Sequence, residues 1–269
     1  MCIISKPVNK VTATKILVAI DESRTRQLIV YSNKIDNVSQ ANAMILPVPN
    51  PTSIKFHDLS NYDNIFADLS IAFRKQFIVS TNSFSYSSSS SSRSIRLPVF
   101  NVGSYKVSIA NTLSDLKLVD SSVFELSEGC EETLKDYPQN FGFIICKLAS
   151  GLEMYHPFGY SHEIIDEYSI FVPTKHYHAH AQSLEIFDRF RNAGPVHSSF
   201  DEEWEHDIYL YNVKGKMISD MSTYMGQYIW NKENPLKRKF DFAFDKCKLM
   251  EKHTINGNNK NVDIMLEVV

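Results

Sequence analysis

Short runs of β-branched and aromatic residues recur along this chain, and turn-forming residues separate many of them. Residues 15–20 and 27–31 are two such runs, and the charged, turn-like residues 21–24 lie between them. A third run, residues 43–46, is followed by prolines at every second position from 47 to 51, which keep the chain extended. The first two runs therefore predict a hairpin, and the third predicts a strand with an extended exit.

A second hairpin is predicted in the middle of the chain. Residues 97–102 and 105–110 are strand-like and flank Gly103 and Ser104. Glycine at the first of two turn positions is typical of a type II′ turn. Because strands joined as hairpins favour antiparallel pairing, we expect an α+β protein, mainly antiparallel β-sheet with a few helices.

Other segments are assigned by the spacing of their apolar residues. Residues 60–77 place apolar side chains three and four positions apart, which predicts an amphipathic helix that Ser60 or Asn61 can cap. We expect further short helices at residues 112–120, 129–137 and 219–230. Further strands are expected at residues 141–148, 168–172, 208–213 and 262–269.

The length and composition fit a single globular domain. The chain has 269 residues, of which 43% are hydrophobic and 22% are charged, and no hydrophilic linker divides it. Residues 80–94 contain an unbroken serine run from 87 to 92, too poor in apolar surface to order itself. We therefore expect one domain, residues 1–269, with a flexible serine-rich insertion at 80–94.

Charge and cysteine usage restrict the environment and the partners. A net charge of -3 does not favour nucleic-acid or membrane-surface binding, and no stretch approaches about 18 apolar residues. The four cysteines, Cys2, Cys130, Cys146 and Cys247, contain no CxxC pair and are not disulfide-dense. We expect an intracellular protein with reduced thiols.

Three of the nine histidines stand at alternate positions in a segment that is predicted to be a β-strand. They are His176, His178 and His180. Side chains at alternate positions of a strand share one face, so these imidazoles can converge on one ion, and a transition metal such as zinc is the candidate cofactor. Against this hypothesis, the segment matches no known short metal-binding motif, and a hydrogen-bonded structural role is the alternative.

Nearby polar residues can complete such a site. His156, His162 and Glu163 lie a short connection upstream, and strand pairing can bring them close. Downstream, the acidic stretch 201–207 surrounds His206, which a carboxylate can orient as a general base. The alternative for this stretch is a solvated loop or the start of a helix.

Cys2 is a second chemical candidate. Removal of Met1 would place a thiol and a free α-amine on one residue, which is the arrangement of N-terminal-nucleophile hydrolases. The predicted reaction is amide hydrolysis, with His206 or the histidine segment in auxiliary roles. The residues after Cys2 lack the glycine that follows the cysteine in glutamine amidotransferases, and packing as a small hydrophobe is the alternative.

A compact basic cluster lies near the C-terminus. Lys237, Arg238 and Lys239 stand together, as in short nuclear-import signals, but Asp241 and Asp245 follow closely. Nuclear localisation is therefore one hypothesis, and a solvated charged stretch is the other.

Several segments resemble an uncharacterised protein family of bacteria and of large DNA viruses that infect amoebae. The similarity covers nearly the full length and is carried by Met1-Cys2 and by residues 43–49, 102–108, 137–147 and 171–178. Family members also carry a histidine near 205–209, which groups His206 with the histidine segment. The resemblance implies a viral origin and one intact domain. It implies no catalytic residue, because no activity is associated with the family. The departure of this chain from the bacterial pattern at residues 177–180 argues against a shared active site.

The sequence thus bounds the class of protein without defining a reaction. We expect a soluble viral protein that binds an unidentified protein partner inside the infected host cell. The alternatives are an amide hydrolase that uses Cys2 and a metal-binding protein that uses His176, His178 and His180.

Overall fold

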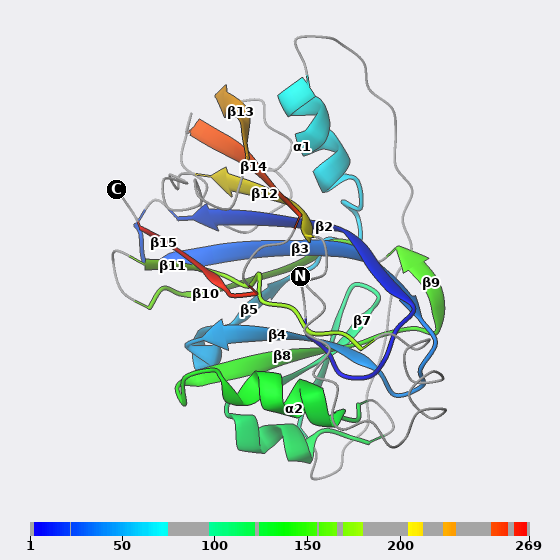
Figure 1. Cartoon of the computed structure of the whole chain (residues 1–269). Coiled ribbons are helices and arrows are strands. Elements are labelled where there is room, and N and C mark those ends of the chain that lie inside the picture. The colour runs from blue at the N-terminus through cyan, green and yellow to red at the C-terminus, as the bar shows by residue number, and fades with distance from the viewer. Residues whose placement is uncertain are drawn as a thin grey trace.

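In the part of the chain that the structure describes, three β-sheets form the framework, and two α-helices lie on the outer faces of the two larger sheets (Figure 1). This architecture is that of a computed structural model of the whole sequence. It confirms the predicted α+β class with mainly antiparallel pairing. The structure describes residues 3–21, 23–74, 97–121, 124–154, 156–165, 169–179, 204–211, 223–229, 249–257 and 261–267.

The largest sheet has eight strands and contains the predicted hairpin of residues 15–31. In spatial order the first seven strands are β13 (Thr223–Ile229), β14 (Leu249–Gly257), β12 (Trp204–Tyr211), β2 (Lys10–Ile20), β3 (Arg26–Asn37), β10 (Phe158–Glu163) and β5 (Lys55–His57). The eighth strand, β9 (Gly151–Met154), pairs with the far end of β3. All of these pairs are antiparallel except β12 with β2, which is parallel.

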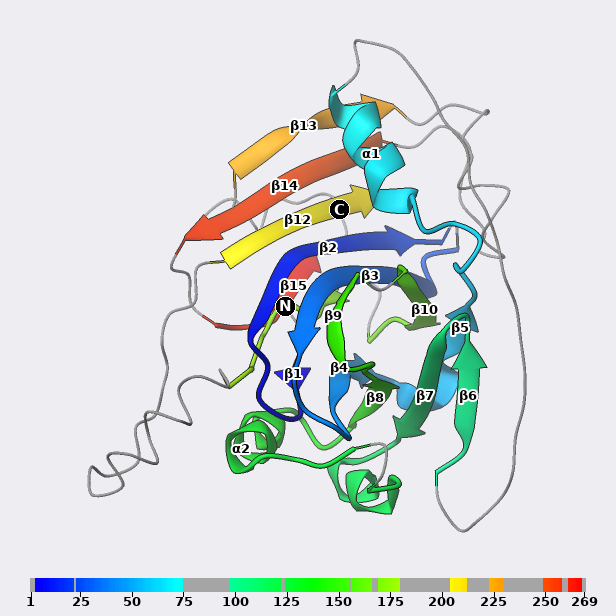
Figure 2. The same cartoon turned by 90° about the vertical axis from the view of Figure 1, so that its right-hand side faces the viewer.

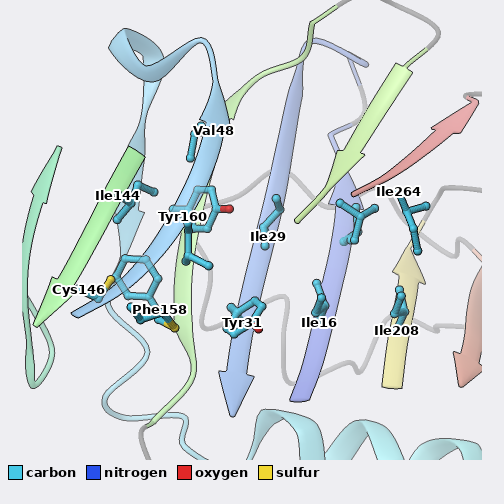
Figure 3. Packing of buried hydrophobic residues seen from close by; sticks show 14 of the residues in the cluster. Ile16, Ile29, Tyr31, Val48, Ile144, Cys146, Phe158, Tyr160, Ile208 and Ile264 are labelled. Atoms are coloured by element: carbon cyan, nitrogen blue, oxygen red, sulfur yellow. The ribbon is translucent and has the colours of Figure 1, made fainter. Parts of the chain in front are cut away.

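Two smaller sheets pack against the same face of the large sheet. The five-stranded sheet has the order β1 (Ile3–Ile4), β4 (Ala43–Pro49), β8 (Phe141–Lys147), β7 (Tyr105–Ala110) and β6 (Val99–Val102). The two-stranded sheet consists of β11 (Ser169–Val172) and β15 (Ile264–Glu267). One hydrophobic cluster draws buried residues from all three sheets, among them Ile16, Ile144 and Ile264 (Figure 3).

The continuous apolar run in β3 is explained by burial on both of its faces. Ile29 and Tyr31 point into the cluster between the sheets (Figure 3). Leu28 and Val30 point to the opposite face and pack against a second cluster beneath α1 (Ile65–Arg74). A strand that is buried on both faces does not alternate apolar with polar residues, so the apolar run of β3 contains no polar residue between 28 and 31.

The helices cover the outer faces of the two larger sheets. Phe66 of α1 packs against Tyr209 on the eight-stranded sheet, whereas Cys130 and Leu134 of α2 (Glu128–Lys135) pack against the five-stranded sheet. Both helices were predicted, although α1 begins later than expected because Tyr62 N–H bonds to the Leu59 carbonyl in a turn. Two 3-10 helices are short connections, η1 (Pro51–Ser53) and η2 (Leu113–Leu118).

One predicted helix is wrong. Residues 219–230 were expected to be helical, but β13 occupies Thr223–Ile229 and pairs with β14. The register of this pair shifts between Tyr224 and Gly226. A β-bulge breaks the two-residue alternation that identifies a strand in sequence, which explains the error.

Several sequence predictions fall on residues that the structure does not describe. They are the serine-rich insertion 80–94, the basic residues Lys237, Arg238 and Lys239, and the candidates Cys2 and His180. Among the described helices, none is both long and apolar enough to cross a membrane.

Candidate functional site

The histidine candidates lie in a segment that passes between the first strand and the last part of the chain. Residues 174–179, which we call the histidine seam, follow β11 but form no regular strand. The prediction of a strand through His176, His178 and His180 is therefore wrong for the described residues. Pro173 has no N–H to donate to a ladder, and side chains bind the seam where a neighbouring strand would.

One side of the seam is held by residues just before β15. The N–H of His176 donates to Asn261 Oδ1 at 2.8 Å, and Asn261 Nδ2 donates to the His176 carbonyl at 2.7 Å. The N–H of Lys175 donates to Asp263 Oδ1 at 2.8 Å, and Thr174 Oγ1 donates to the Val262 carbonyl at 2.9 Å. Two side chains thus replace the hydrogen bonds of a paired strand.

The other side of the seam contacts the N-terminal strand. Ile3 forms a parallel bridge with Tyr177, and the N–H of Ile4 donates to the Tyr177 carbonyl at 2.7 Å. Tyr177 also packs on the first turn of α2, where a side chain at Gly129 would place its Cβ 2.3 Å from the tyrosine hydroxyl. The seam therefore joins the N-terminal strand, α2 and the segment before β15.

Three imidazoles gather along the seam. The rings of His176 and His178 are 6.1 Å apart, and His206 on β12 lies 6.5 Å from His176. His176 and His206 are buried. Burial lowers the pKa of His206 far below its ordinary value, and the nearby His176 lowers it further. His206 is therefore neutral at physiological pH.

These ring separations do not form a zinc site. Zinc binds a histidine nitrogen at about 2.0–2.1 Å, which places the rings of two ligands on a tetrahedral ion about 5 Å apart. Both measured separations are larger. Among the described residues, no group of three His, Cys, Asp or Glu side chains can hold a metal ion. A site that includes His180 stays a prediction.

The other predicted ligands are placed elsewhere. β10, which carries His162 and Glu163, pairs with β3 and β5. His162 is buried and stacks on Tyr160. His156 Nε2 accepts a 2.9 Å hydrogen bond from the N–H of Ser104 at the β6–β7 turn. Among the described strands, no pairing joins these residues to the histidine seam.

Asp207, in the described part of the acidic stretch, does not orient His206. This part begins in β12, and Asp207 follows His206, so strand alternation points the two side chains to opposite faces. Asp207 instead accepts a hydrogen bond from Thr254 Oγ1 at 2.8 Å and pairs with Lys252 Nζ at 2.9 Å. Its role here is to bind β12 to β14.

One partly buried carboxyl next to the seam was missed by sequence analysis. Burial raises the pKa of Asp263, although its hydrogen bond from the Lys175 N–H opposes the rise. Neither Asp263 nor Asn261 stands in a recognisable motif. Both side chains bind the backbone of the seam. The only sequence signal for this role is an Asn and an Asp at alternate positions, a pattern that is common in loops.

A serine–histidine contact was also absent from the sequence analysis. His57 Nε2 lies 3.0 Å from Ser161 Oγ, and Arg26 Nη2 lies 3.3 Å from the same oxygen. Ser161 is buried, and Arg26 also donates to the Ser53 carbonyl at 2.8 Å. The group therefore joins β3, β5 and β10 and does not offer a nucleophile to solvent.

Comparison with known proteins identifies the fold. No protein-family model matches the sequence. The crystal structure of baculovirus P35 is similar to this chain with a TM-score of 0.51 and 13% identity, over 100% of this chain and 99% of P35. A mutated baculovirus P35 after caspase cleavage aligns with a TM-score of 0.49 and 14% identity, over 97% and 98% of the two chains.

A third structure, the complex of caspase-8 with P35, aligns with a TM-score of 0.46 and 11% identity, over 96% of this chain and 97% of that chain. Because the sequence identities are low, the comparison shows similarity of fold alone. This chain has a P35-like fold. The resemblance to a family of bacteria and amoeba-infecting viruses stays a prediction, because these structures come from a baculovirus protein.

Proposed function

We propose that this chain is a viral interaction protein whose partner in the infected cell is a protease of the caspase class. The observation that carries the proposal is the likeness to baculovirus P35 along the whole of both chains. P35 has been crystallised with caspase-8 and after cleavage by a caspase. A shared fold alone does not transfer a partner, so the partner needs a direct test.

The architecture suits a scaffold that presents binding segments. The inner faces of the sheets are packed into one hydrophobic cluster, and the outer faces of the two larger sheets are covered by α1 and α2. Binding segments are commonly loops held by such a rigid framework. A partner would therefore meet connections between strands rather than the covered sheet faces.

The test is a titration of active caspase-8 with the purified full-length chain. We expect the cleavage of a fluorogenic peptide to fall in proportion to the chain added, and a complex to elute together on gel filtration. Mass spectrometry of the same mixture reports whether the chain is itself cleaved. A papain-type cysteine protease serves as the control for general thiol-protease inhibition. Unchanged caspase activity with no complex would reject the proposal.

A second candidate function, amide hydrolysis by Cys2, is favoured by the position of β1. Cys2 lies outside the described residues, but it immediately precedes Ile3, and His176 immediately precedes the residue that pairs with Ile3. A thiol needs a nearby base to act as a nucleophile, and His176, His178 and His206 are the candidates.

The matched test compares two cysteines. Cys130 is buried, and burial raises the pKa of its thiol well above the ordinary value, so it is an unreactive control. We expect Cys2→Ala to abolish hydrolysis of amide substrates and Cys130→Ala to retain it. If neither substitution changes activity, Cys2 is not the nucleophile.

The metal hypothesis is tested on the same preparation. Native mass spectrometry of protein purified without chelator reports any bound transition metal, and a stoichiometric zinc mass that His178→Ala and His180→Ala remove would support it. Absence of metal from such a sample would reject it.

A further inference from the structure

The edge strand β6 is apolar and exposed on both of its faces. Val99 and Phe100 are 52% and 39% exposed, and successive side chains of a strand point to opposite faces. Among the described strands, β6 pairs only with β7, and it ends the five-stranded sheet (Figure 2). Its outer edge therefore combines exposed apolar side chains with an open backbone.

The turn between β6 and β7 determines which backbone groups face outward. Val102 pairs with Tyr105 across the two turn residues, and the residues flanking such a turn exchange hydrogen bonds. Because bonded and non-bonded pairs alternate in an antiparallel ladder, Phe100 bonds to β7. The N–H and C=O groups of Val99 and Asn101 point away from β7.

Contacts at the turn hold this strand in place. The φ of Gly103 is +58°, and a side chain there would place its Cβ 2.5 Å from His156 Nε2, so only glycine fits. His156 also accepts from the N–H of Ser104, and its carbonyl accepts from the Tyr105 hydroxyl at 2.7 Å. At the other end, Phe100 packs on Phe56 with ring centroids 5.8 Å apart.

The edges of the other sheets carry features that oppose pairing with another chain. β5 is only three residues long and begins with the exposed Lys55. β13 has a bulge between Tyr224 and Gly226. Proteins protect exposed strand edges by such means, and short, charged or bulged edges pair poorly.

In the two-stranded sheet, a side chain binds the backbone of β11. Gln27 bonds with both backbone groups of Phe171 on β11, accepting from its N–H at 3.1 Å and donating to its carbonyl. By contrast, residues 97–105 contain no charged side chain, and β6 runs in regular register with β7. β6 therefore carries neither the charge of β5 nor the bulge of β13.

We propose that two copies of this chain associate through β6, which pairs antiparallel with β6 of the second copy. The outward-facing residues Val99 and Asn101 are two positions apart, so a two-fold axis at Phe100 matches each of them with the other. Phe100 then lies opposite Phe100 of the second copy as a cross-strand aromatic pair. Because the strand is uncharged, self-pairing brings no like charges together, and the two five-stranded sheets become one sheet.

This association goes beyond the proposed caspase binding and is independent of it. Sedimentation velocity of the full chain over about 1–500 μM should show a species of twice the 30.8 kDa monomer. We expect Phe100→Lys and Asn101→Pro each to raise the dimer dissociation constant at least tenfold. Val38→Lys is the matched control, because Val38 is 49% exposed but lies outside every strand, and its dimer should be unchanged.

A cross-link tests the register directly. Opposed residues of a non-hydrogen-bonded antiparallel pair have Cα atoms about 4.5 Å apart, which a disulfide can bridge. Phe100→Cys should therefore form a disulfide-linked dimer on mild oxidation, whereas Val38→Cys and the unmodified chain should not. A monomer at every concentration, or a dimer unaffected by both edge substitutions and without the Phe100→Cys cross-link, would overturn the proposal. Circular dichroism of each variant confirms that it is folded.

Discussion

The β2–β3 ladder and the histidine seam are both tightly bonded, but their backbones are held by different partners. In the ladder, nine residue pairs run from Lys10 opposite Asp36 to Ile20 opposite Gln27, and backbone groups bond to one another. In the seam, the side chains of Asn261 and Asp263 bind the backbone of His176 and Lys175. We therefore expect the ladder to be destabilised mainly by substitutions that remove packing. The seam should be destabilised mainly by substitutions that remove hydrogen bonds or change a charge.

The largest expected effect is a cavity in the ladder. Ile29 is buried in the cluster between the sheets, and Ile29→Ala should lower the free energy of unfolding by roughly 2–5 kcal/mol. Urea denaturation measures the change. Ile29→Val is the matched control and should cost about 0.5–1.5 kcal/mol. A loss under about 1 kcal/mol for Ile29→Ala would show that the core collapses around the gap.

Acid should destabilise the fold through buried histidines. Burial lowers the pKa of His162 from 6.5 to about 4, so the unfolded chain takes up the proton first as the pH falls. His162 therefore costs no stability above about pH 6.5, and the cost grows to about 3 kcal/mol as the pH falls to its folded pKa near 4.

The measurement is the free energy of unfolding at pH 7 and pH 4.5 for the natural chain and for His162→Asn. The Asn side chain can still donate to the Glu163 carbonyl that His162 contacts at 2.8 Å, but it does not titrate. We expect a smaller acid-induced loss in the variant, because carboxyl groups titrate equally in both proteins. Equal losses would place the acid sensitivity elsewhere, for example at His206.

A smaller and more local effect is expected in the seam. Asn261→Ala removes both hydrogen bonds to the backbone of His176 and should cost about 1–2 kcal/mol, since water can reach part of the site. Asn261→Asp retains an acceptor for the His176 N–H and should cost less. Hydrogen exchange should accelerate at His176 and stay unchanged in β2. Acceleration in both regions would mean that they unfold as one unit.

The same contrast explains what the sequence could predict. Both hairpins and both α-helices arise from local patterns: alternation or apolar runs, helical spacing, and the glycine that the turn at Gly103 requires. The parallel pairing of β12 with β2 joins residues nearly 200 positions apart, and no local pattern encodes it. β14 was not predicted. β13 was assigned as a helix because the bulge between Tyr224 and Gly226 breaks the alternation that identifies a strand.

The site was predicted only in part for a related reason. The spacing of His176 and His178 suggested that their rings lie near each other, and the structure brings His206 beside them. Their supports, Asn261 and Asp263, lie about 85 residues away in sequence. Hydrogen bonds between a side chain and a distant backbone leave no periodic signal in the sequence. The sequence therefore predicted a strand where the segment is irregular and is held by the side chains of Asn261 and Asp263.

The smallest expected effect lies where the ladder meets the seam. Ala13 has φ +53°, and the register of β2 with β3 shifts between Thr12 and Lys15. A left-handed backbone costs a non-glycine residue about 1–2 kcal/mol, whereas glycine adopts it freely but loses more entropy on folding. Ala13→Gly should therefore stabilise the chain by about 0.5 kcal/mol in urea denaturation.

Ala19 provides the matched control, because it lies in the regular part of β2 and is buried. There the same substitution brings no relief of strain, and Ala19→Gly should destabilise the chain by about 1 kcal/mol. Opposite signs at the two alanines would show that the bulge stores strain next to Thr14, which pairs with His206 on β12, beside the seam. A loss of stability at both positions would show instead that the bulge is unstrained and that the ladder is uniform up to the seam.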